Sequence, residues 1–238
     1  MEWQNVANAL FPLGHTISED EQFLSGTGTT NGGVVEVIGT CGHAPIGVEI
    51  ALAQAQAILR CVREHPGRSI VLLVDTQGQR LRHRDEMLGI NSYMAHLGKC
   101  VELARRAGHR IVALVYDQAL SGGFITSGLM ADACYALPDA TIRVMGLPAM
   151  ARITKVPEER LVELAKSNPV FAPGPENYLR MGGLQAIWER DLAVCLEQAL
   201  AAAADGDNRA ALGRQRGGRT MAQTVVEAIL GGQHASPP

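Results

Sequence analysis

The segments IVLLVDTQG (residues 70–78) and IVALVYDQALSGGF (residues 111–124) decide the fold of this chain. Each opens with an uninterrupted apolar run, which is typical of a strand buried on both faces. Between them, apolar residues at helical spacing and a stop at Gly108 predict a helix over roughly 84–107. Two fully apolar strands joined by a helix predict a parallel βαβ unit, so the expected fold class is α/β.

The pattern continues on both sides of this unit. Val34 to Ile38 predicts a preceding strand, and apolar positions from Val48 to Val62 predict a helix that Pro66-Gly67 ends. Downstream we expect a buried helix from Phe124, followed by short strands at 134–137 and 141–145. Three more helices are expected, one starting at Pro157 and the others at 189–204 and 219–230. Residues 1–32 predict an irregular arm or a loop over a partner, and residues 205–238 a polar C-terminal extension. With no internal repeat and no clear linker, we expect one domain over 1–238.

The composition is that of a folded globular protein. Of the 238 residues, 47% are hydrophobic and 19% are charged. The net charge is −3 and the basic residues form no stripe, so no nucleic-acid partner is expected. No apolar stretch approaches the roughly 18 residues of a membrane span, and the first residues do not resemble a signal peptide. The five cysteines are scattered without a CxxC pair, which argues against a zinc ribbon and favours reduced thiols in a cytoplasmic protein.

The candidate site lies in the two segments that end the apolar strands. Asp75-Thr76-Gln77-Gly78 follows the first strand, and Ser121-Gly122-Gly123 follows the second. Parallel sheets bind ligands at the carboxyl ends of their strands. Unpaired N–H groups at a helix start, with glycines that let a ligand approach the backbone, form a site for an anionic oxygen. Small glycine-containing loops are also ordinary turns, so each segment alone leaves both interpretations open.

Three motifs in this order resemble those of acyl-CoA carboxyltransferases. Residues 75–78 resemble their Asp-Thr-Pro-Gly segment, 121–124 their Gly-Gly turn into the central helix, and 136–146 their Trp-Pro-x-Ala segment ending in Val-Met-Gly. Within that superfamily the chain is most similar to gamma subunits of biotin-independent malonate decarboxylase, over about residues 34–200. The distinctive stretches are GHAPIGVE (42–49) and PGPENYLRMG (173–182). Gln77 departs from the usual proline, so this loop is expected to be less rigid.

The resemblance implies a crotonase-like (ClpP/crotonase) fold, a spiral of ββα units with C-terminal helices. It implies a gamma subunit that pairs with a crotonase-like beta subunit, forms the active site between the two, and decarboxylates a malonyl thioester to an acetyl thioester and CO2. The substrate is then carried on the coenzyme-A-like prosthetic group of an acyl carrier protein, served by its transferase subunit. No cofactor bound by this chain itself is implied.

The resemblance also implies which residues form the site. One subunit's glycine turn holds the acyl oxygen, and the other's holds the carboxyl or biotin oxygen. We expect the second role for the backbone N–H groups of Gly122, Gly123 and Phe124. Substrate-binding positions are implied at Gln77, Gly78 and Gly146.

Several of these residues have rival interpretations. Ser121 could be a nucleophile, as in Clp-type peptidases of the same fold, but nothing fixes a base near it, and a helix N-cap is favoured. Cys41 and His43 could form a thiol–imidazole pair, although structural roles are favoured. The seven histidines lack a ligand spacing such as HExxH, so no metal site is expected.

Two alternatives concern function and the remaining polar residues. None of the three lysines lies in a biotinylation context, so the chain is not a biotin carrier. It could instead be a carboxyltransferase subunit of a biotin-dependent carboxylase or decarboxylase, or a mainly structural partner subunit. Asp85 and Glu86 are expected to be solvated acids of a first helical turn. Tyr178 and Arg180 fit a functional role and a helix surface equally well.

Overall fold

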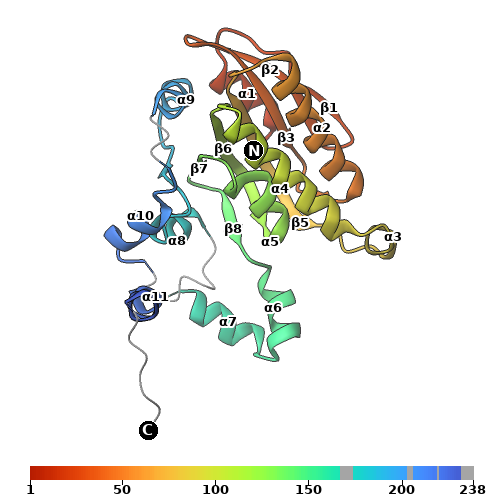
Figure 1. Ribbon diagram of the computed structural model, residues 1–238. Coiled ribbons are helices and arrows are strands. Elements are labelled where there is room, and N and C mark those ends of the chain that lie inside the picture. The colour runs from red at the N-terminus through yellow and green to blue at the C-terminus, as the bar shows by residue number, and fades with distance from the viewer. Residues whose placement is uncertain (167–173, 203–205, 219, 232–238) are drawn as a thin grey trace.

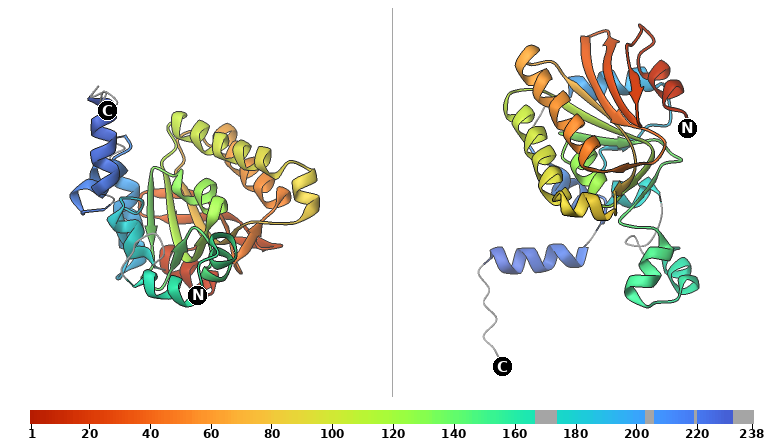
Figure 2. Two further views of the ribbon diagram at one scale, coloured as in Figure 1. Left: turned by 90° about the horizontal axis from the view of Figure 1, so that it is seen from below. Right: turned by 90° about the vertical axis from the view of Figure 1, so that its right-hand side faces the viewer.

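The computed structural model describes residues 1–166, 174–202, 206–218 and 220–231, and within them the chain forms a nine-stranded sheet covered by helices (Figure 1, Figure 2). The strands are β1 (Ser18–Asp20), β2 (Phe23–Thr30), β3 (Gly33–Thr40), β4 (Ala44–Ile46), β5 (Ile70–Gln79), β6 (Ile111–Leu120), β7 (Ala133–Ala136), β8 (Thr141–Arg143) and β9 (Ala186–Ile187). The helices are α1 (Trp3–Leu10), α2 (Val48–Glu64), α3 (His83–Met87), α4 (Ile90–Arg106), α5 (Ser121–Phe124), the π-helical turn η1 (Ile125–Leu129), α6 (Leu147–Thr154), α7 (Glu158–Ala165), α8 (Pro175–Arg180), α9 (Leu192–Ala201), α10 (Arg209–Gln215) and α11 (Thr220–Leu230).

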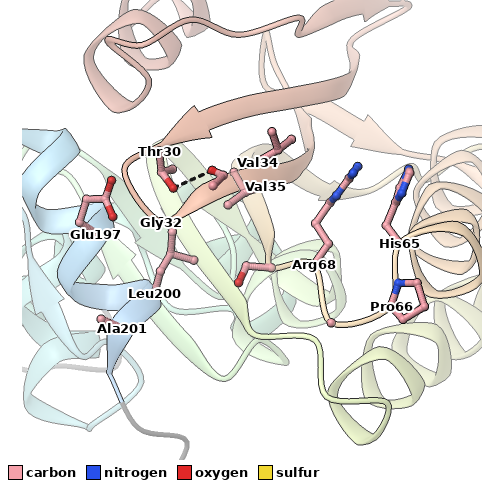
Figure 3. Close-up of a pocket in the computed structure, with 13 residues that line it drawn as sticks. Thr30, Gly32, Val34, Val35, His65, Pro66, Arg68, Glu197, Leu200 and Ala201 are labelled. Atoms are coloured by element: carbon pink, nitrogen blue, oxygen red, sulfur yellow. Dashed lines mark hydrogen bonds between the residues drawn. The ribbon is translucent and has the colours of Figure 1, made fainter.

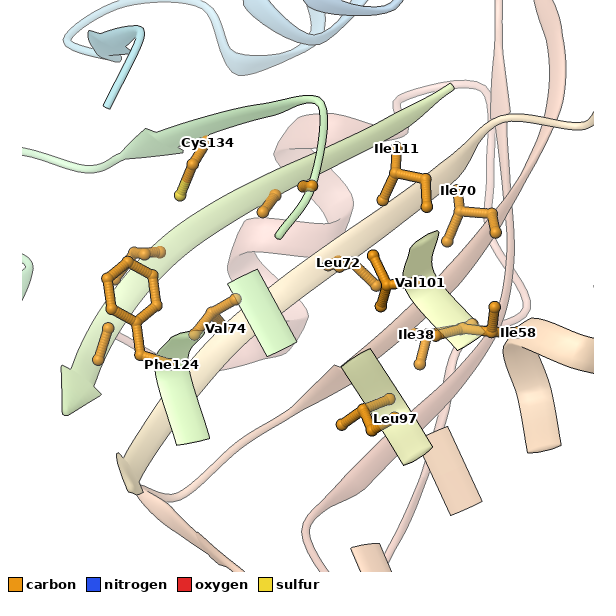
Figure 4. Close-up of a cluster of buried hydrophobic side chains, with 14 of the residues drawn as sticks. Ile38, Ile58, Ile70, Leu72, Val74, Leu97, Val101, Ile111, Phe124 and Cys134 are labelled. Atoms are coloured by element: carbon orange, nitrogen blue, oxygen red, sulfur yellow. The ribbon is translucent and has the colours of Figure 1, made fainter. Parts of the chain in front are cut away.

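The predicted parallel βαβ unit is confirmed. The strands follow the order β1-β2-β3-β5-β6-β7-β9, and pairing is parallel from β3 onward. Two apolar clusters lie on opposite faces of the sheet, because successive residues of β5 and β6 alternate between them. One cluster joins Leu72 and Val74 to α2, α4 and Phe124 (Figure 4), and the other joins Leu73 to α1 and α9.

The prediction of an irregular arm at residues 1–32 is wrong. This segment contains α1 and the antiparallel strands β1 and β2, and β2 pairs with β3 from Phe23↔Thr40 to Thr30↔Gly33. The glycines that suggested a loop are required by packing: a Cβ atom at Gly28 would lie 2.4 Å from the Phe11 ring. A glycine-rich strand therefore lies over the aromatic residue that ends α1.

Helix boundaries also differ from the prediction. The helix expected over 84–107 is two helices, α3 and α4, separated at Gly89, whose φ of 77° is a left-handed conformation. The helices α6, α8 and α10 are additional. The expected helices at 189–204 and 219–230 are observed as α9 and α11, although residues 203–205 and 219 lie outside the described part, as do 167–173 and 232–238. No helix among the described residues is long and apolar enough to cross a membrane.

Asp85 is not the solvated acid that the sequence predicted. Its side chain is fully buried and accepts hydrogen bonds from the Val48 backbone N–H at 3.1 Å and from Arg82 Nε at 2.6 Å. The carboxylate therefore ties the start of α2 to the segment that follows β5. The hydrogen bond from Arg82 holds the pKa of Asp85 below its ordinary value. Glu86, one residue later, is exposed as expected.

Asp85→Asn is expected to lower the free energy of unfolding by about 1.5–3 kcal/mol at pH 7, because the charged acceptor of two hydrogen bonds is lost. Glu86→Gln is the matched control and should change it by less than about 0.5 kcal/mol. Because the folded-state pKa of Asp85 is lowered, its contribution is present above the unfolded-state pKa of about 3.9 and is lost as pH falls through the folded-state pKa. Urea unfolding measures both effects, and equal losses in the two variants would contradict this role.

Candidate functional site

The candidate site lies where β5 changes its partner from β3 to β4 and β6 changes its partner from β7 to β8. Both strands continue beyond their apolar runs, to Gln79 and Leu120, so the predicted loop at residues 75–78 is a strand. Their last residues pair with the short strands β4 and β8. The sheet therefore branches at the carboxyl ends of β5 and β6, where β4 and β8 lie outside the main strand order.

Asp75 holds this branch point together. It is buried at a break in the β5–β6 register, and its carboxylate accepts the backbone N–H of His43 at 2.8 Å and that of Gln118 at 3.3 Å. Burial raises the pKa of Asp75, and the His43 N–H opposes that rise. The carboxylate is thus a structural acceptor that fixes the break in the pairing of the two strands, which resumes at Thr76↔Ala119.

Gly78 and Gly123 make the closest backbone contact of the site. A Cβ atom at Gly123 would lie 2.9 Å from both Cα and C of Gly78, and a Cβ at Gly78, where φ is 97°, would lie 2.8 Å from Cβ of Ser121. The Gly78 N–H donates to Thr76 Oγ1 at 2.9 Å. The amide of Gly78 is therefore engaged within the strand, and this glycine serves the site by letting α5 begin against β5.

Ser121 differs from the prediction of an N-cap. The residue at the cap position is Leu120, and Ser121 itself has a left-handed φ of 53°. Its hydroxyl donates to the Val144 carbonyl at 2.5 Å. The serine therefore joins the start of α5 to the segment after β8. Among the described residues, no basic side chain is hydrogen-bonded to this hydroxyl.

The residues that follow keep the helix start rigid while its carbonyl groups are satisfied. Ser127 Oγ donates to the Gly123 carbonyl at 2.5 Å, and Thr126 Oγ1 donates to the Gly122 carbonyl at 3.3 Å. Phe124 is buried with Tyr178 edge-on against its ring, at 5.9 Å between centroids. Within the distinctive stretch 173–182, Tyr178 thus supports the site from the core, whereas Arg180 is exposed.

The N–H groups of Gly122 and Gly123 belong to the first turn of a continuous helical segment, α5 followed by η1. N–H groups at this position have no acceptor within the helix. Among the described residues, no side chain accepts a hydrogen bond from either of them. Together with the positive end of the helix dipole, they form a site suited to an anionic oxygen.

The other expected residues surround this turn at different depths. Gln77, the residue directly before Gly78, is exposed. Gly146 precedes α6 and follows Val144, the residue whose carbonyl binds Ser121, so it is linked to the turn through that hydrogen bond. The structure thus brings Gly78 and Gly123 into contact and leaves Gln77 and Gly146 at the periphery.

Sequence reasoning missed two polar residues beside the turn. A Cβ at Gly122 would lie 3.3 Å from Oε1 of Gln79, the last residue of β5. Arg143, the last residue of β8, pairs with Leu120 directly before the turn. Both are polar residues at the carboxyl ends of their strands, a local signal that the glycine motifs do not include.

The proposed thiol–imidazole pair is not formed. Burial raises the pKa of the Cys41 thiol to about 12, so it stays protonated. His43 instead places Nε2 3.3 Å from Asp117 and 3.7 Å from Asp75. One nitrogen or oxygen atom from each of these three side chains lies within 4.8 Å of the other two, a spacing that a metal ion could use. Both Asp75 interactions with backbone N–H groups nevertheless favour a structural role.

Two hollows lie away from the turn. A cavity of about 580 Å³ lies at the amino ends of β3 and β5, between Arg68, Glu197 and Leu200 (Figure 3). A largely apolar groove of similar volume runs between α4 and η1, past Met94, Leu103 and Met130. The first opens at the edge of the sheet opposite the carboxyl ends of the strands. Neither hollow is lined by Gly122 or Gly123.

Comparisons with known proteins agree with the motifs. Residues 41–233 match the family model described as malonate decarboxylase gamma subunit. The chain is 36% identical over 203 residues to the malonyl-S-ACP:biotin-protein carboxyltransferase MADD of Malonomonas rubra, covering 76% of this chain and 70% of the relative. It superposes on the Pseudomonas malonate decarboxylase MdcD-MdcE hetero-dimer with a TM-score of 0.75 and 27% identity, over 95% of this chain and 96% of the other.

A more distant match establishes the architecture. The transcarboxylase 12S structure with hydrolysed methylmalonyl-coenzyme A superposes with a TM-score of 0.67 and 19% identity, over 83% of this chain and 40% of the larger one. The crotonase-like α/β fold expected from the motifs is thereby confirmed. Given the family match over most of its length, the chain belongs to the malonate decarboxylase gamma subunit family.

Proposed function

We propose that this chain, paired with a beta-type subunit, decarboxylates a malonyl thioester to an acetyl thioester and CO2. The observation that carries the proposal is the turn at Gly122 and Gly123, which presents two backbone N–H groups at the start of the partly buried helical segment α5–η1 in a chain of this family. The turn lies where two strand ends meet, which is where parallel sheets bind their ligands.

The chemistry needs two separate oxygen sites. Decarboxylation breaks the bond from the α-carbon to the carboxyl carbon, and its electron pair moves onto the thioester as an enolate, which then takes up a proton. We assign the carboxyl oxygens to the N–H groups of Gly122, Gly123 and Phe124, and the thioester oxygen to the partner's turn. A donor aimed at a developing oxyanion contributes roughly 3 kcal/mol.

This assignment has a kinetic signature. Negative charge leaves the carboxyl group as CO2 forms, so donors on that group bind the substrate better than the transition state. Removing them should therefore raise KM without lowering kcat to a comparable extent, since the barrier from bound substrate to transition state does not increase. Donors on the thioester oxygen act in the opposite sense, because charge develops there during the reaction.

The partners follow from the relatives. The Pseudomonas relative is a hetero-dimer, and the name of the Malonomonas relative specifies malonyl-S-ACP as its substrate. We therefore assign this chain a beta-type partner and an acyl carrier protein, with its transferase subunit, whose coenzyme-A-like arm carries the acyl group. Gln77, Gly78 and Gly146 are proposed to border the approach of that arm, and the chain itself is proposed to bind no cofactor.

A carboxyltransferase role in a biotin-dependent enzyme is the second candidate. It is favoured by one observation, the 36% identity to a protein named as a malonyl-S-ACP:biotin-protein carboxyltransferase. The two roles differ in the fate of the carboxyl group, which is released as CO2 in the first and transferred to biotin in the second.

The isolated polypeptide is expected to have no measurable malonyl-thioester decarboxylase activity, because it contains one of the two oxygen sites. Adding the beta-type subunit should restore turnover, and avidin should not inhibit it. Rates of acetyl-thioester formation, with size-exclusion chromatography to verify the complex, measure this. Full activity of the purified chain alone would contradict the shared site, and inhibition by avidin would favour the carboxyltransferase.

Gly122→Ala is expected to reduce kcat/KM on the order of 10-fold to 100-fold, mainly by raising KM, because the methyl group occupies the space where the carboxyl oxygen is held. The new Cβ would meet Gln79 Oε1 at 3.3 Å, a side-chain contact that can adjust, so the fold should persist. Gly123→Val is a poorer probe, since its Cβ would collide with the Gly78 backbone. Steady-state kinetics of the complex measure the effect.

Two controls accompany this test. Gly32→Ala, in the β2–β3 turn, makes the same change where a Cβ has ordinary contacts of 3.7 and 3.8 Å, and should retain activity. Ser121→Ala removes the hydrogen bond to Val144 and should cost about 1 kcal/mol of stability while most activity remains. A nearly inactive Ser121→Ala would restore the nucleophile interpretation, and normal kinetics for Gly122→Ala would remove this turn from the active site.

A further inference from the structure

Buried polar atoms without a partner gather beside the glycine turn, residues 121–124. The described residues contain three buried side-chain nitrogen or oxygen atoms with no hydrogen-bond partner: Gln54 Nε2, Gln79 Oε1 and Arg143 Nε. Gln79 Oε1 borders this turn, and the backbone of Arg143 pairs with Leu120, the residue directly before it. Leaving a buried acceptor unpaired is unfavourable, so such an atom marks a place where a binding partner is missing.

Gln79 has the closer geometry. Its Oε1 lies against Gly122, 3.3 Å from the position of a Cβ there, yet it accepts no hydrogen bond from the described residues. The partial positive charge at the start of a helix attracts a neighbouring carbonyl oxygen. The side-chain amide thus places its oxygen beside Gly122, one of the residues whose N–H groups we assign to the substrate.

The two ends of an amide have nearly the same size but opposite hydrogen-bonding roles. An anion held by the Gly122 and Gly123 N–H groups would repel Oε1 and attract Nε2. Rotation about the last side-chain bond exchanges the two atoms without needing more space. The glycine turn can therefore be matched by an oxygen when it is empty and by an N–H donor when an anion is bound.

We propose that Gln79 is a substrate-binding residue of the glycine turn, whose amide rotates to donate from Nε2 to the carboxyl group of the substrate. Arg143, paired with Leu120 beside the turn, adds positive charge that favours the same anion. The inference rests on the proposed function, because it assumes that this turn holds a carboxylate. It adds a side-chain donor to a site otherwise made of backbone.

Two substitutions separate the charge of this residue from its packing. Gln79→Met keeps the length and removes the donor, and should raise KM for malonyl thioester on the order of 10-fold with a smaller change in kcat. Gln79→Glu places a carboxyl group against the substrate's own, and should raise KM on the order of 100-fold at pH 8. Lowering the pH toward 5.5 should reduce that deficit, because protonation of the introduced group, whose pKa the neighbouring anion raises, ends the repulsion.

Gln198→Glu is the matched control. Gln198 is exposed on α9, which packs on the face of the sheet opposite α5, so the same charge change should leave both kinetic constants within about 2-fold of the parent. Circular dichroism and size-exclusion chromatography check folding and complex formation. A purely structural role for Gln79 would give no recovery at low pH.

A second measurement does not depend on turnover. Free malonate should raise the thermal unfolding midpoint of the assembled complex, since a ligand of the folded state stabilises it. Gln79→Met and Gln79→Glu should remove most of that shift, and Gln198→Glu should keep it. A malonate shift that is present in a parent complex without decarboxylase activity, and is lost in both Gln79 variants, would support the anion site while refuting the proposed function. Parent-like kinetics and parent-like malonate shifts in both Gln79 variants would overturn the inference.

Discussion

The contact between Gly78 and Gly123 is the constraint on which the site depends. Each of these residues lacks the side chain that would keep α5 away from β5, since a Cβ on either one would approach the other segment within 2.9 Å. Their approach lets the helix begin directly at the carboxyl edge of the sheet. The first N–H groups of that helix then lie at this edge without an acceptor inside the helix, while Phe124, three residues after Ser121, is fully enclosed in the core.

The branching of the sheet makes this contact possible. Asp75 accepts N–H groups from His43, directly before β4, and from Gln118, near the end of β6. Beyond it β5 pairs with β4 instead of β3, and β6 pairs with β8 instead of β7. The cost of burying this carboxylate is visible in its raised pKa, and the backbone hydrogen bonds offset it. A polar residue inside an apolar sheet thereby sets the position of the edge, and with it the distance between Gly78 and the turn.

The proposed site is made mainly from backbone amides, which explains why composition and side-chain patterns alone say little about the chemistry. The thiol of Cys41 is held protonated by burial, and Ser121 gives its hydroxyl proton to a carbonyl, so neither nucleophile has an activating partner in the described residues. Gln79 and Arg143 stand beside the turn with unpaired buried atoms, and such atoms cannot be recognised until the neighbouring strands are in place.

The sequence by itself determined the parallel βαβ unit, because buried strands such as Ile70–Val74 and amphipathic helices such as α2 carry their periodicity in the order of their residues. It also determined the glycine turn, since the motif is local, and the family, since the motifs lie in a characteristic order. Tertiary structure alone decided that Gly26 and Gly28 lie in a strand, that Asp85 is buried and that Ser121 bonds to Val144 rather than capping a helix. It also decided that Gln79 faces Gly122. Each of these depends on which distant backbone a residue meets, and that is set by packing between segments far apart in the chain and not by the local pattern of polarity.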